Sequence, residues 1–369
     1  LGAKRLLEHL PAGCTDNCKA VYKPEEILAC LAAQPDTDTA VLYSGDTGFY
    51  SGAAKLLPLL RVMGYSVRVL PGLSSVQLLA AAVGRPWQDW KLVSAHGRAC
   101  DPVAEILVHP QVFFLTGGGD TPATLCAKLT AAGLGAAHAL VGENLGTPAE
   151  AIRFGLAREL AEQTFAPLSV LLIEREALPP RRCPGLPDDA FIRGAVPMTK
   201  QEVRAAALAK LAVTPTDTLW DVGAGTGSVS VELALAAPAG QVYAVECDPE
   251  ACALIQQNRE KFAAYNLTLL EGKAPEALDA LPAPDAVFIG GTKGNMDAVI
   301  DAVLHKNPAA RLCIAAIALE TLSAAVAALT AHGLAAEVTQ IAVSRTKAAG
   351  SLHLLMANNP VFLITGART

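Results

Sequence analysis

A glycine-rich turn at residues 221–227, with the sequence DVGAGTG, constrains the fold of this chain more than any other feature. A strand-like run at 217–222 leads into the turn, and a helix-like run at 229–235 leads out of it. Glycine lets the backbone turn sharply and approach a ligand where a Cβ would clash. Glu246 ends the next strand-like run, where an acidic residue can accept hydrogen bonds from ribose hydroxyls. The pattern predicts a βα unit that binds a nucleotide-bearing cofactor.

The spacing of the glycines narrows the class of cofactor. Dinucleotide-binding folds use G-x-G-x-x-G, which places a pyrophosphate at a helix N-terminus. This chain has G-x-G-x-G preceded by Asp221, so a nicotinamide-linked oxidoreductase is disfavoured. The turn resembles motif I of the Rossmann-like methyltransferases, whose ligand, S-adenosylmethionine, carries no phosphate. An ordinary glycine-rich turn is the simpler alternative, and the flanking periodicities together with Glu246 weigh against it.

Composition and charge limit the other classes of function. Apolar residues make up 52% of the 369 residues, enough for the cores of two domains. The net charge of −6 argues against a general nucleic-acid binder, because neutralising phosphates requires a basic face. No run approaches the roughly 18 apolar residues of a membrane span. The nine scattered cysteines, none in a C-x-x-C pair, are typical of thiols in a reducing compartment. We expect a cytoplasmic protein with no metal site and no membrane or nucleic-acid partner.

A proline-rich stretch divides the chain. Five prolines fall within residues 179–197, which we interpret as a linker between a first domain at 1–178 and a second at 198–369. Both halves alternate strand-like and helix-like runs, which predicts α/β domains. In the second half, residues 335–344 and 353–364 are expected to form a closing hairpin. The predicted strands of the first half are 40–43, 67–70, 92–94, 112–115, 138–141 and 168–173.

The loops after these strands carry a resemblance to known families. In the first half, YSGDTGFYSG at 43–52, PGLSSVQ at 71–77, SAHGR at 94–98 and GENLG at 142–146 are similar to the two-lobed tetrapyrrole methylases, or class III methyltransferases. The second half, with VPMTKQEVR at 196–204, GKAPEAL at 272–278 and VFIGG at 287–291, resembles the decarboxylating precorrin methylases. The resemblance covers nearly the whole chain, although the first strand and glycine-rich loop of the tetrapyrrole methylases would precede Leu1.

The resemblance implies an activity. It implies methylation of a precorrin macrocycle at carbons 5 and 15 by S-adenosyl-L-methionine, with decarboxylation of the ring C acetate, in cobalamin biosynthesis. One S-adenosylmethionine is expected in each domain. A homo-oligomer is also implied, with a tetramer built on the second half as one form. The resemblance fits a cobalt-free or a cobalt-bound macrocycle and either order of the two methylations.

The resemblance also assigns cofactor-binding residues. In the second domain they are Thr199, Gly223, Ala224, Gly225, Thr226, Gly227, Glu246 and Ala274. In the first domain they are Gly45, Asp46, Ser74, Ser75, Thr116 and Asn144. Thr199 has another interpretation, as the N-cap of a helix at 200–211, because Glu202 completes a capping-box pattern.

Positively charged residues are candidates for holding the substrate's carboxylates. They are Lys200, Arg204, Lys293 and Arg345 in the second domain, and His96 and Arg98 in the first. Arg345 is expected in a loop before the final strand. Most Lys and Arg side chains are solvated surface cations, and a loop histidine is more often structural. Methyl transfer from a sulfonium depends on positioning and on exclusion of water, so no Ser or Cys nucleophile is expected.

Two alternative functions remain at this point. In the first, only the second domain is active and the first is a scaffold, which a cofactor titration would test. In the second, the N-P-V-F run beginning at Asn359 marks an amino-methyltransferase of nucleic acids, whose related motif grips a flipped base. That motif belongs after the fourth strand, whereas Asn359 falls on the last predicted strand, and the net charge also disfavours this function.

Overall fold

The computed structural model describes residues 1–11, 13–14, 17–35, 37–97, 100–176, 178 and 183–368. Two compact units emerge from the contacts within the chain. Unit 1 comprises residues 1–100, 111–127 and 138–174, and unit 2 comprises 101–110, 128–137 and 175–369. Residues 183–197, the described part of the predicted linker, therefore belong to unit 2. None of the helices in the described ranges is long and apolar enough to cross a membrane.

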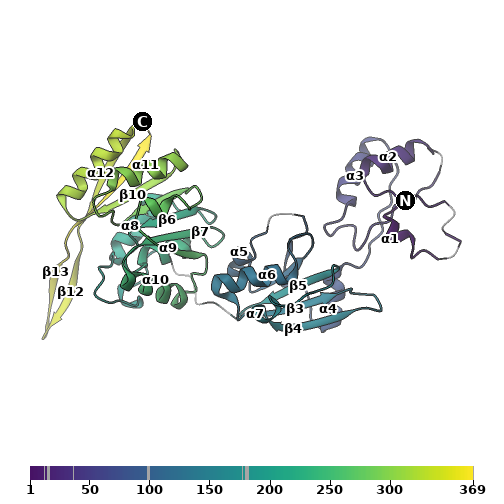
Figure 1. The fold of residues 1–369 in the computed structure, drawn as a ribbon, viewed down its shortest axis with the longest axis horizontal. Coiled ribbons are helices and arrows are strands. Elements are labelled where there is room, and N and C mark those ends of the chain that lie inside the picture. Colours follow the sequence, from purple (N-terminus) through teal and green to yellow (C-terminus); the bar gives the residue numbers. More distant parts are fainter. Residues whose placement is uncertain are drawn as a thin grey trace. The chain divides into compact units, whose positions relative to one another are not determined.

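Unit 2 contains a seven-stranded sheet in the order β11-β14-β10-β9-β6-β7-β8 (Figure 1). The five strands β6 to β10 are parallel, and β14 runs antiparallel to both β10 and β11. This is the predicted doubly wound α/β plan. The strands are β6 (Thr218–Val222), β7 (Gln241–Glu246), β8 (Leu267–Glu271), β9 (Ala286–Ile289), β10 (Arg311–Ala316), β11 (Leu334–Ile341) and β14 (Val361–Arg368).

Helices cover both faces of this sheet. One layer holds α8, α9 and α10, and the other holds α11 and α12 (Figure 1). Successive strand residues point to opposite faces, so Leu219 lies in one core and Trp220 in the other, both fully buried. The helices and short turns of unit 2 are α5 (Pro102–Val108), the π-helical turn η1 (Thr130–Leu134), η2 (Asp188–Ala190), α8 (Gln201–Leu211), α9 (Ser228–Ala236), α10 (Pro249–Lys261), η3 (Glu276–Leu278), α11 (Met296–Lys306) and α12 (Leu319–Ala331).

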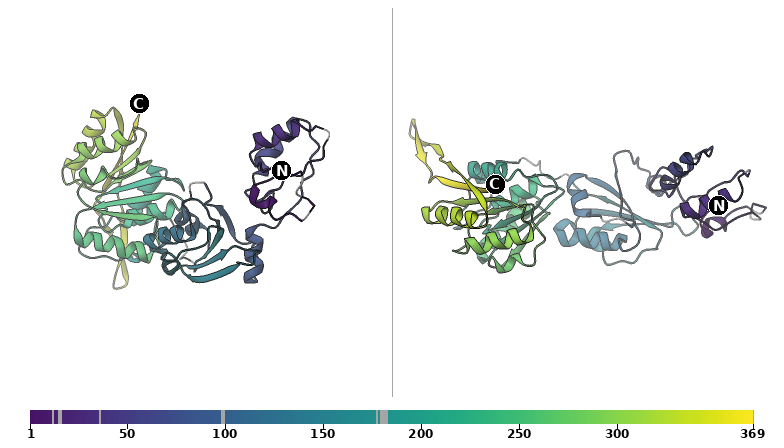
Figure 2. Two further views of the ribbon diagram at one scale, coloured as in Figure 1. Left: turned by 45° about the vertical axis from the view of Figure 1, so that its right-hand side comes forward. Right: turned by 90° about the horizontal axis from the view of Figure 1, so that it is seen from above.

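The predicted closing hairpin is only partly right. Strands β11 and β14 do pair with each other, but the chain between them forms a separate two-stranded ribbon, β12 (Ser344–Ala349) and β13 (Leu352–Ala357). This ribbon projects from unit 2 (Figures 1 and 2). Gly350, with φ of +63°, closes its turn, which is a conformation that glycine adopts readily. Asn359 lies between β13 and β14, so its predicted place on the last strand was wrong.

Unit 1 contains a five-stranded sheet in the order β1-β2-β5-β3-β4. Helix α4 packs on one face, where Leu79, Phe113 and Leu172 are fully buried in a shared core. The elements of the sheet region are α4 (Ser75–Val83), β1 (Lys91–Ser94), β2 (Gln111–Leu115), α6 (Pro122–Leu129), β3 (His138–Glu143), β4 (Ala151–Leu156), α7 (Ala157–Leu160) and β5 (Ser169–Glu174). Strand β4 was not predicted.

The first 73 residues depart from the predicted strands. They form α1 (Lys4–Leu7), α2 (Pro24–Ala32) and α3 (Ala53–Val62), with Ile27 and Leu56 in a small apolar cluster. The strand predicted at 40–43 is reduced to an isolated bridge between Leu42 and Gly2, and the one predicted at 67–70 is irregular. A strand forms only where a neighbour pairs with it along several residues, and these apolar runs have no such neighbour within the described ranges.

Candidate active site

Four loops of unit 2 meet at one edge of its sheet. Strands β6, β7, β8 and β9 are parallel, so their carboxyl ends share this edge, where α/β folds bind ligands. The loops that follow them hold the glycine turn at 223–227, residues 247–248, residues 272–275 and residues 290–295. Contacts between the loops make them one site.

The glycine turn has a backbone conformation that other residues rarely adopt. Gly223 has φ of +73°, and a Cβ there would lie 2.4 Å from the carbonyl oxygen of Gly291. Gly227 also has φ of +73°, and its Cβ would lie 3.0 Å from Cγ1 of Ile255. Gly225, with φ of +57°, is partly exposed between them. The turn is therefore fixed on both sides and open at its centre.

Glu246 is bonded to this turn. Its Oε2 accepts a hydrogen bond from the Gly225 N–H at 2.9 Å, and its Oε1 accepts from the N–H groups of Cys247 and Asp248 at 2.7 and 3.0 Å. A carboxylate has about four acceptor positions, so one position on Oε2 remains. These three bonds fix the orientation of the Glu246 carboxylate, which favours binding of a hydroxyl group at the remaining position.

Two buried polar atoms lie at this edge without a hydrogen-bond partner in the described part of the chain. They are Oδ1 of Asp221 and Oγ1 of Thr226. The other oxygen of Asp221 accepts a hydrogen bond from the Ser230 hydroxyl. Burial raises the pKa of Asp221 to about 7, the Ser230 bond opposes this rise, and the charge of Glu246 adds to it. Buried polar atoms are rarely left unpaired, and both of these fall within the motif at 221–227.

The remaining two loops supply a cation and an amide. Lys293, exposed and with φ of +49°, donates from Nζ to Sγ of Cys247 at 3.1 Å, and this bond raises the pKa of Lys293. Asn295 donates from Nδ2 to the carbonyl oxygen of Ala274 at 3.4 Å. Lys293 and Ala274, both predicted site residues, therefore lie at the same edge as the glycine turn.

The segment before α8 departs from the predicted cap. The helix begins at Gln201, its N-cap is Lys200, and no capping side-chain bond forms there. The predicted capping box of Thr199 and Glu202 was wrong, because the Glu202 carboxylate instead accepts hydrogen bonds from Arg345. Thr199 and Lys200 remain partly exposed.

Arg204 does not lie where a substrate could reach it. Its side chain is fully buried, with Nε donating to Glu232 at 2.8 Å and Nη1 to Asp188 at 2.9 Å. The carbonyl oxygens of Thr199 and Leu186 accept its other hydrogen bonds. The predicted role of Arg204 in gripping substrate is therefore corrected to a structural one. The sequence contains one sign of this buried ion pair: Glu232 is a lone glutamate in an apolar helical run.

Arg345 extends this buried network. It lies on β12, not in the predicted loop, and donates from Nη1 to Asp188 at 2.9 Å and from Nη2 to Glu202 at 2.6 Å. Burial raises the pKa of Asp188, but the hydrogen bonds and charges of Arg204 and Arg345 outweigh it, so the net shift is downward. The guanidinium of Arg345 is therefore already paired with two carboxylates, those of Asp188 and Glu202.

Unit 1 also gathers predicted residues at one edge of its sheet. His96, Thr116 and Asn144 follow β1, β2 and β3, whose carboxyl ends lie at the same edge of the sheet, with the start of β5 between those of β2 and β3. The Thr116 hydroxyl donates to the Ser169 carbonyl oxygen at 2.5 Å, and Nδ1 of His96 lies 3.4 Å from the Thr116 carbonyl oxygen. A Cβ on Gly117 would lie 1.7 Å from that nitrogen, so only glycine leaves room for His96.

The other predicted residues of unit 1 come from two loops. Gly45, with φ of +76°, packs against Ser74, whose Cα lies 3.8 Å from the position of a Gly45 Cβ. Asp46 accepts a hydrogen bond from the Gly48 N–H at 2.6 Å. Ser74 and Gln77 form a capping box at α4, of which Ser75 is the first residue. Arg98 lies outside the described residues.

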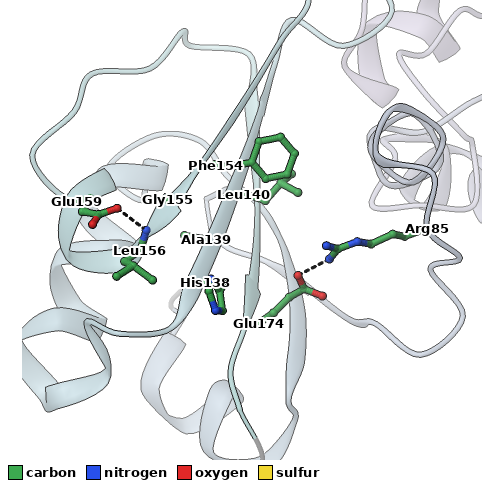
Figure 3. A pocket seen from close by; sticks show the side chains of 9 residues that line it. All are labelled: Arg85, His138, Ala139, Leu140, Phe154, Gly155, Leu156, Glu159 and Glu174. Atoms are coloured by element: carbon green, nitrogen blue, oxygen red, sulfur yellow. Dashed lines mark hydrogen bonds and ion pairs between the residues drawn. The ribbon is translucent and has the colours of Figure 1, made fainter.

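A groove in unit 1 lies away from these residues. Figure 3 shows it between β3, β4 and the end of β5, with the exposed Phe154 on one side and the ion pair of Arg85 and Glu174 on the other. It includes His138, the first residue of β3, and thus the opposite edge of the sheet. In the described ranges, no three His, Cys, Asp or Glu side chains gather as a metal site.

The parallel sheet, the glycine turn and the acidic residue after the next strand define unit 2 as a Rossmann-like class I methyltransferase that uses S-adenosylmethionine. Residues 189–367 match the precorrin methyltransferase domain family, and residues 8–161 match the tetrapyrrole (corrin/porphyrin) methylases. The match and the site agree on the class of enzyme.

Individual relatives narrow this class. A precorrin-6Y C(5,15)-methyltransferase [decarboxylating] of Sinorhizobium sp is 37% identical over 286 residues, which is 76% of this chain and 68% of that one. A probable cobalt-precorrin-6B C(15)-methyltransferase (decarboxylating) of Pyrobaculum calidifontis is 46% identical over 189 residues, 50% of this chain and 97% of that one. The crystal structure of precorrin-6Y C5,15-methyltransferase from Geobacter metallireducens GS-15 covers 50% of this chain and 96% of its own, at 41% identity and a TM-score of 0.48.

This chain belongs to the family of the decarboxylating precorrin-6Y C(5,15)-methyltransferases. It is a methyltransferase, and the family predicted from its sequence motifs is confirmed.

Proposed function

We propose that this chain transfers methyl groups from S-adenosylmethionine to carbons 5 and 15 of a precorrin macrocycle and removes carbon dioxide from its ring C acetate, as a step in cobalamin biosynthesis. Beyond the family, the observation that carries this proposal is the edge of unit 2. There a fixed glycine turn and the bonded Glu246, whose Oε2 keeps one acceptor position, lie together at the carboxyl ends of β6 and β7. The macrocycle that the enzyme receives is either cobalt-free or cobalt-bound.

Each residue at this edge has a role in the proposed reaction. S-adenosylmethionine supplies an electrophilic methyl group when bound. The remaining acceptor position of Glu246 receives one ribose hydroxyl, and the partly exposed Gly225 lets the cofactor approach the backbone. Lys293, at this edge, and Lys200, partly exposed at the start of α8, are cations that can hold the carboxylates of the macrocycle. The conjugated ring donates the electron pair to the methyl group in methylation, while the bond pair of the sulfonium leaves with sulfur, and the ring accepts the pair of the broken carbon–carbon bond in decarboxylation. The protein's task is therefore to position the reactants and exclude water.

We propose a second S-adenosylmethionine in unit 1. The support is the placement of His96, Thr116 and Asn144 at strand ends on one edge of the sheet, where α/β sheets receive ligands. The packing of Gly45 against Ser74 joins two further predicted residues.

We also propose that the chain forms a homo-oligomer and is located in the cytoplasm. Support for assembly through unit 2 comes from the β12–β13 ribbon, on which Leu352, Leu354, Leu355 and Met356 are all exposed. Contiguous exposed apolar residues of this kind mark protein contacts. Light scattering after size-exclusion chromatography tests the assembly, and a monomer would contradict it.

The activity is tested with the full chain, S-adenosylmethionine and the precorrin precursor. Mass spectrometry of the product should show two added methyl groups and the loss of one carbon dioxide. Calorimetric titration should give two S-adenosylmethionine molecules per chain. One added methyl group with carbon dioxide loss, and one bound cofactor, would show that only unit 2 acts. A macrocycle recovered unchanged while the cofactor binds would contradict the proposed substrate.

A further inference from the structure

One segment of unit 2 runs beside the glycine turn. This strap, residues 191–199, connects η2 to α8. Near its end, the carbonyl oxygen of Pro197 lies 3.3 Å from the position that a Cβ on Gly225 would take, and Cγ1 of Val196 lies 3.9 Å from the same position. The strap therefore forms a wall against the open centre of the turn.

One buried amide joins the strap to the turn. Asn258, on α10, is fully buried. Its Oδ1 accepts a hydrogen bond from the Ile192 N–H at 2.8 Å. Its Nδ2 donates to the carbonyl oxygen of Ile192 at 3.0 Å and to the carbonyl oxygen of Thr226, inside the glycine turn, also at 3.0 Å. A single side chain thus holds both segments in register.

Two further contacts keep the strap against unit 2. Glu250, also on α10, accepts a hydrogen bond from the Ala195 N–H at 3.3 Å. At the start of the strap, the ring of Phe191 lies with its centroid 4.8 Å from that of Phe262 and 4.7 Å from the guanidinium carbon of Arg204. These contacts hold the strap at its start and middle, whereas Asn258 alone of these side chains also bonds the glycine turn.

We propose that Asn258 is a positioning residue for the cofactor of unit 2. It sets the spacing between the strap and the glycine turn, and thereby the affinity for S-adenosylmethionine. The inference rests on the proposed function in taking the glycine turn as the binding site. Without the Nδ2 donor, the strap and the turn lose their shared partner, the wall moves away from the turn, and the cofactor dissociates faster.

The matched variants are Asn258→Asp and Asn266→Asp. The first keeps the acceptor for Ile192 N–H and removes both donated bonds. Asn266 is equally suited as a control, because it is 1% exposed and its Nδ2 donates to three carbonyl oxygens of unit 2 that lie outside the strap and the turn. Both variants place the same new group at a buried position, so a loss of stability is common to them.

The first measurement is limited trypsin digestion of the full chain without cofactor, which cleaves after the exposed Arg193 in the strap. Asn258→Asp should speed cleavage there about tenfold, as expected for two lost hydrogen bonds. The second measurement is the Kd for S-adenosylmethionine by calorimetry. Asn258→Asp should raise the Kd of the unit 2 site about tenfold, and Asn266→Asp should leave it within about twofold of the unchanged protein.

Equal effects of the two variants on cleavage or on Kd would overturn the inference. A failure of the unchanged protein to bind S-adenosylmethionine would instead overturn the proposed function, and the positioning role with it. If Asn258→Asp does not fold, Glu250→Ala replaces it, because Glu250 is exposed. It should speed cleavage after Arg193 and raise the Kd about threefold each, as one weaker bond is lost. Faster cleavage with an unchanged Kd would also overturn the inference, because it would show that loosening the strap does not weaken cofactor binding.

Discussion

The strand ends of the two units differ in how their polar groups are satisfied. In unit 2, Oδ1 of Asp221 and Oγ1 of Thr226 are buried with no partner in the described part of the chain. In unit 1, the corresponding edge has the Thr116 hydroxyl bonded to Ser169. An unpaired buried polar atom costs about 1–3 kcal/mol, so these two oxygens lower the stability of unit 2. The Tyr43 hydroxyl of unit 1 is also buried without a partner in the described part of the chain, but Tyr43 packs against the apolar cluster of the first helices.

The ion pairs of the two units differ in the same direction. Arg204 of unit 2 is fully buried between Asp188 and Glu232. Arg153 of unit 1 bonds Glu143, but half of its side chain is exposed, with a fraction of 51%. Unit 2 thus depends on contacts that tolerate little change, which suits a site that must hold a reaction geometry. Four substitutions test this contrast, in order of decreasing expected effect.

Gly223→Ala should abolish the reaction of unit 2. Its Cβ would collide with the Gly291 carbonyl oxygen, and the shift of the turn should lower decarboxylation about 100-fold or more. Release of carbon dioxide from the macrocycle measures it. Gly350→Ala is the control, because Gly350 also has positive φ but nothing within 4 Å of its Cβ position. Decarboxylation at the normal rate in Gly223→Ala would show that the glycine turn is not part of the active site.

Arg204→Ala should destabilise the chain by about 3–5 kcal/mol, because it leaves buried carboxylates without their cation. Arg153→Ala, which breaks a half-exposed pair, should cost about 1 kcal/mol or less. Urea denaturation of both variants measures the difference in free energy of unfolding. Equal losses of stability in the two variants would show that the buried ion pairs of Arg204 contribute no more than the half-exposed pair of Arg153.

Asp221→Asn should change the dependence of stability on pH. Burial raises the pKa of Asp221 to about 7 in the folded chain, from the model-compound value of 3.8. Between these values the unfolded chain releases the proton and the folded chain keeps it, so this residue lowers the stability as pH rises and has no such effect below pH 3.8. Asp221→Asn should therefore be more stable relative to the unchanged protein at pH 8 than at pH 5.

The size of this effect is on the order of a few kcal/mol, since each unit of pKa corresponds to about 1.4 kcal/mol. Thermal unfolding at the two pH values, with cofactor left out, measures it. A difference of the opposite sign would mean that Asp221 is ionised in the folded protein.

Thr116→Val should have the smallest effect on stability, about 1 kcal/mol, because it removes one hydrogen bond. It should also lower the methylation assigned to unit 1 while leaving decarboxylation unchanged, so the product gains one methyl group. Product mass and carbon dioxide release are measured in the same sample, so that the reactions assigned to the two units are compared under identical conditions. Two methyl groups added at the normal rate would place the cofactor of unit 1 elsewhere.

The sequence predicted most of unit 2, because period and spacing are local signals. Strand β6, helix α9 and the glycine turn between them lie where the pattern placed them. The network of Arg204 was missed because its partners are 16 and 28 residues away, and single-chain periodicity carries no pairing information. The runs at 40–43 and 67–70 were overpredicted for a related reason, since apolar alternation indicates a strand without showing that a neighbour exists.

The strap has a consequence for anyone who divides this chain into separately produced pieces. The proline pattern suggests cutting at residue 198, yet Asp188, Phe191 and Ile192 lie upstream and are already built into the second unit. A piece beginning at Met198 would expose the ring contact of Phe262, remove both bonds between Asn258 and Ile192, and give Arg204 one carboxylate fewer. A piece that keeps these contacts of the second unit begins before Asp188, inside the stretch that the proline pattern marks as a linker.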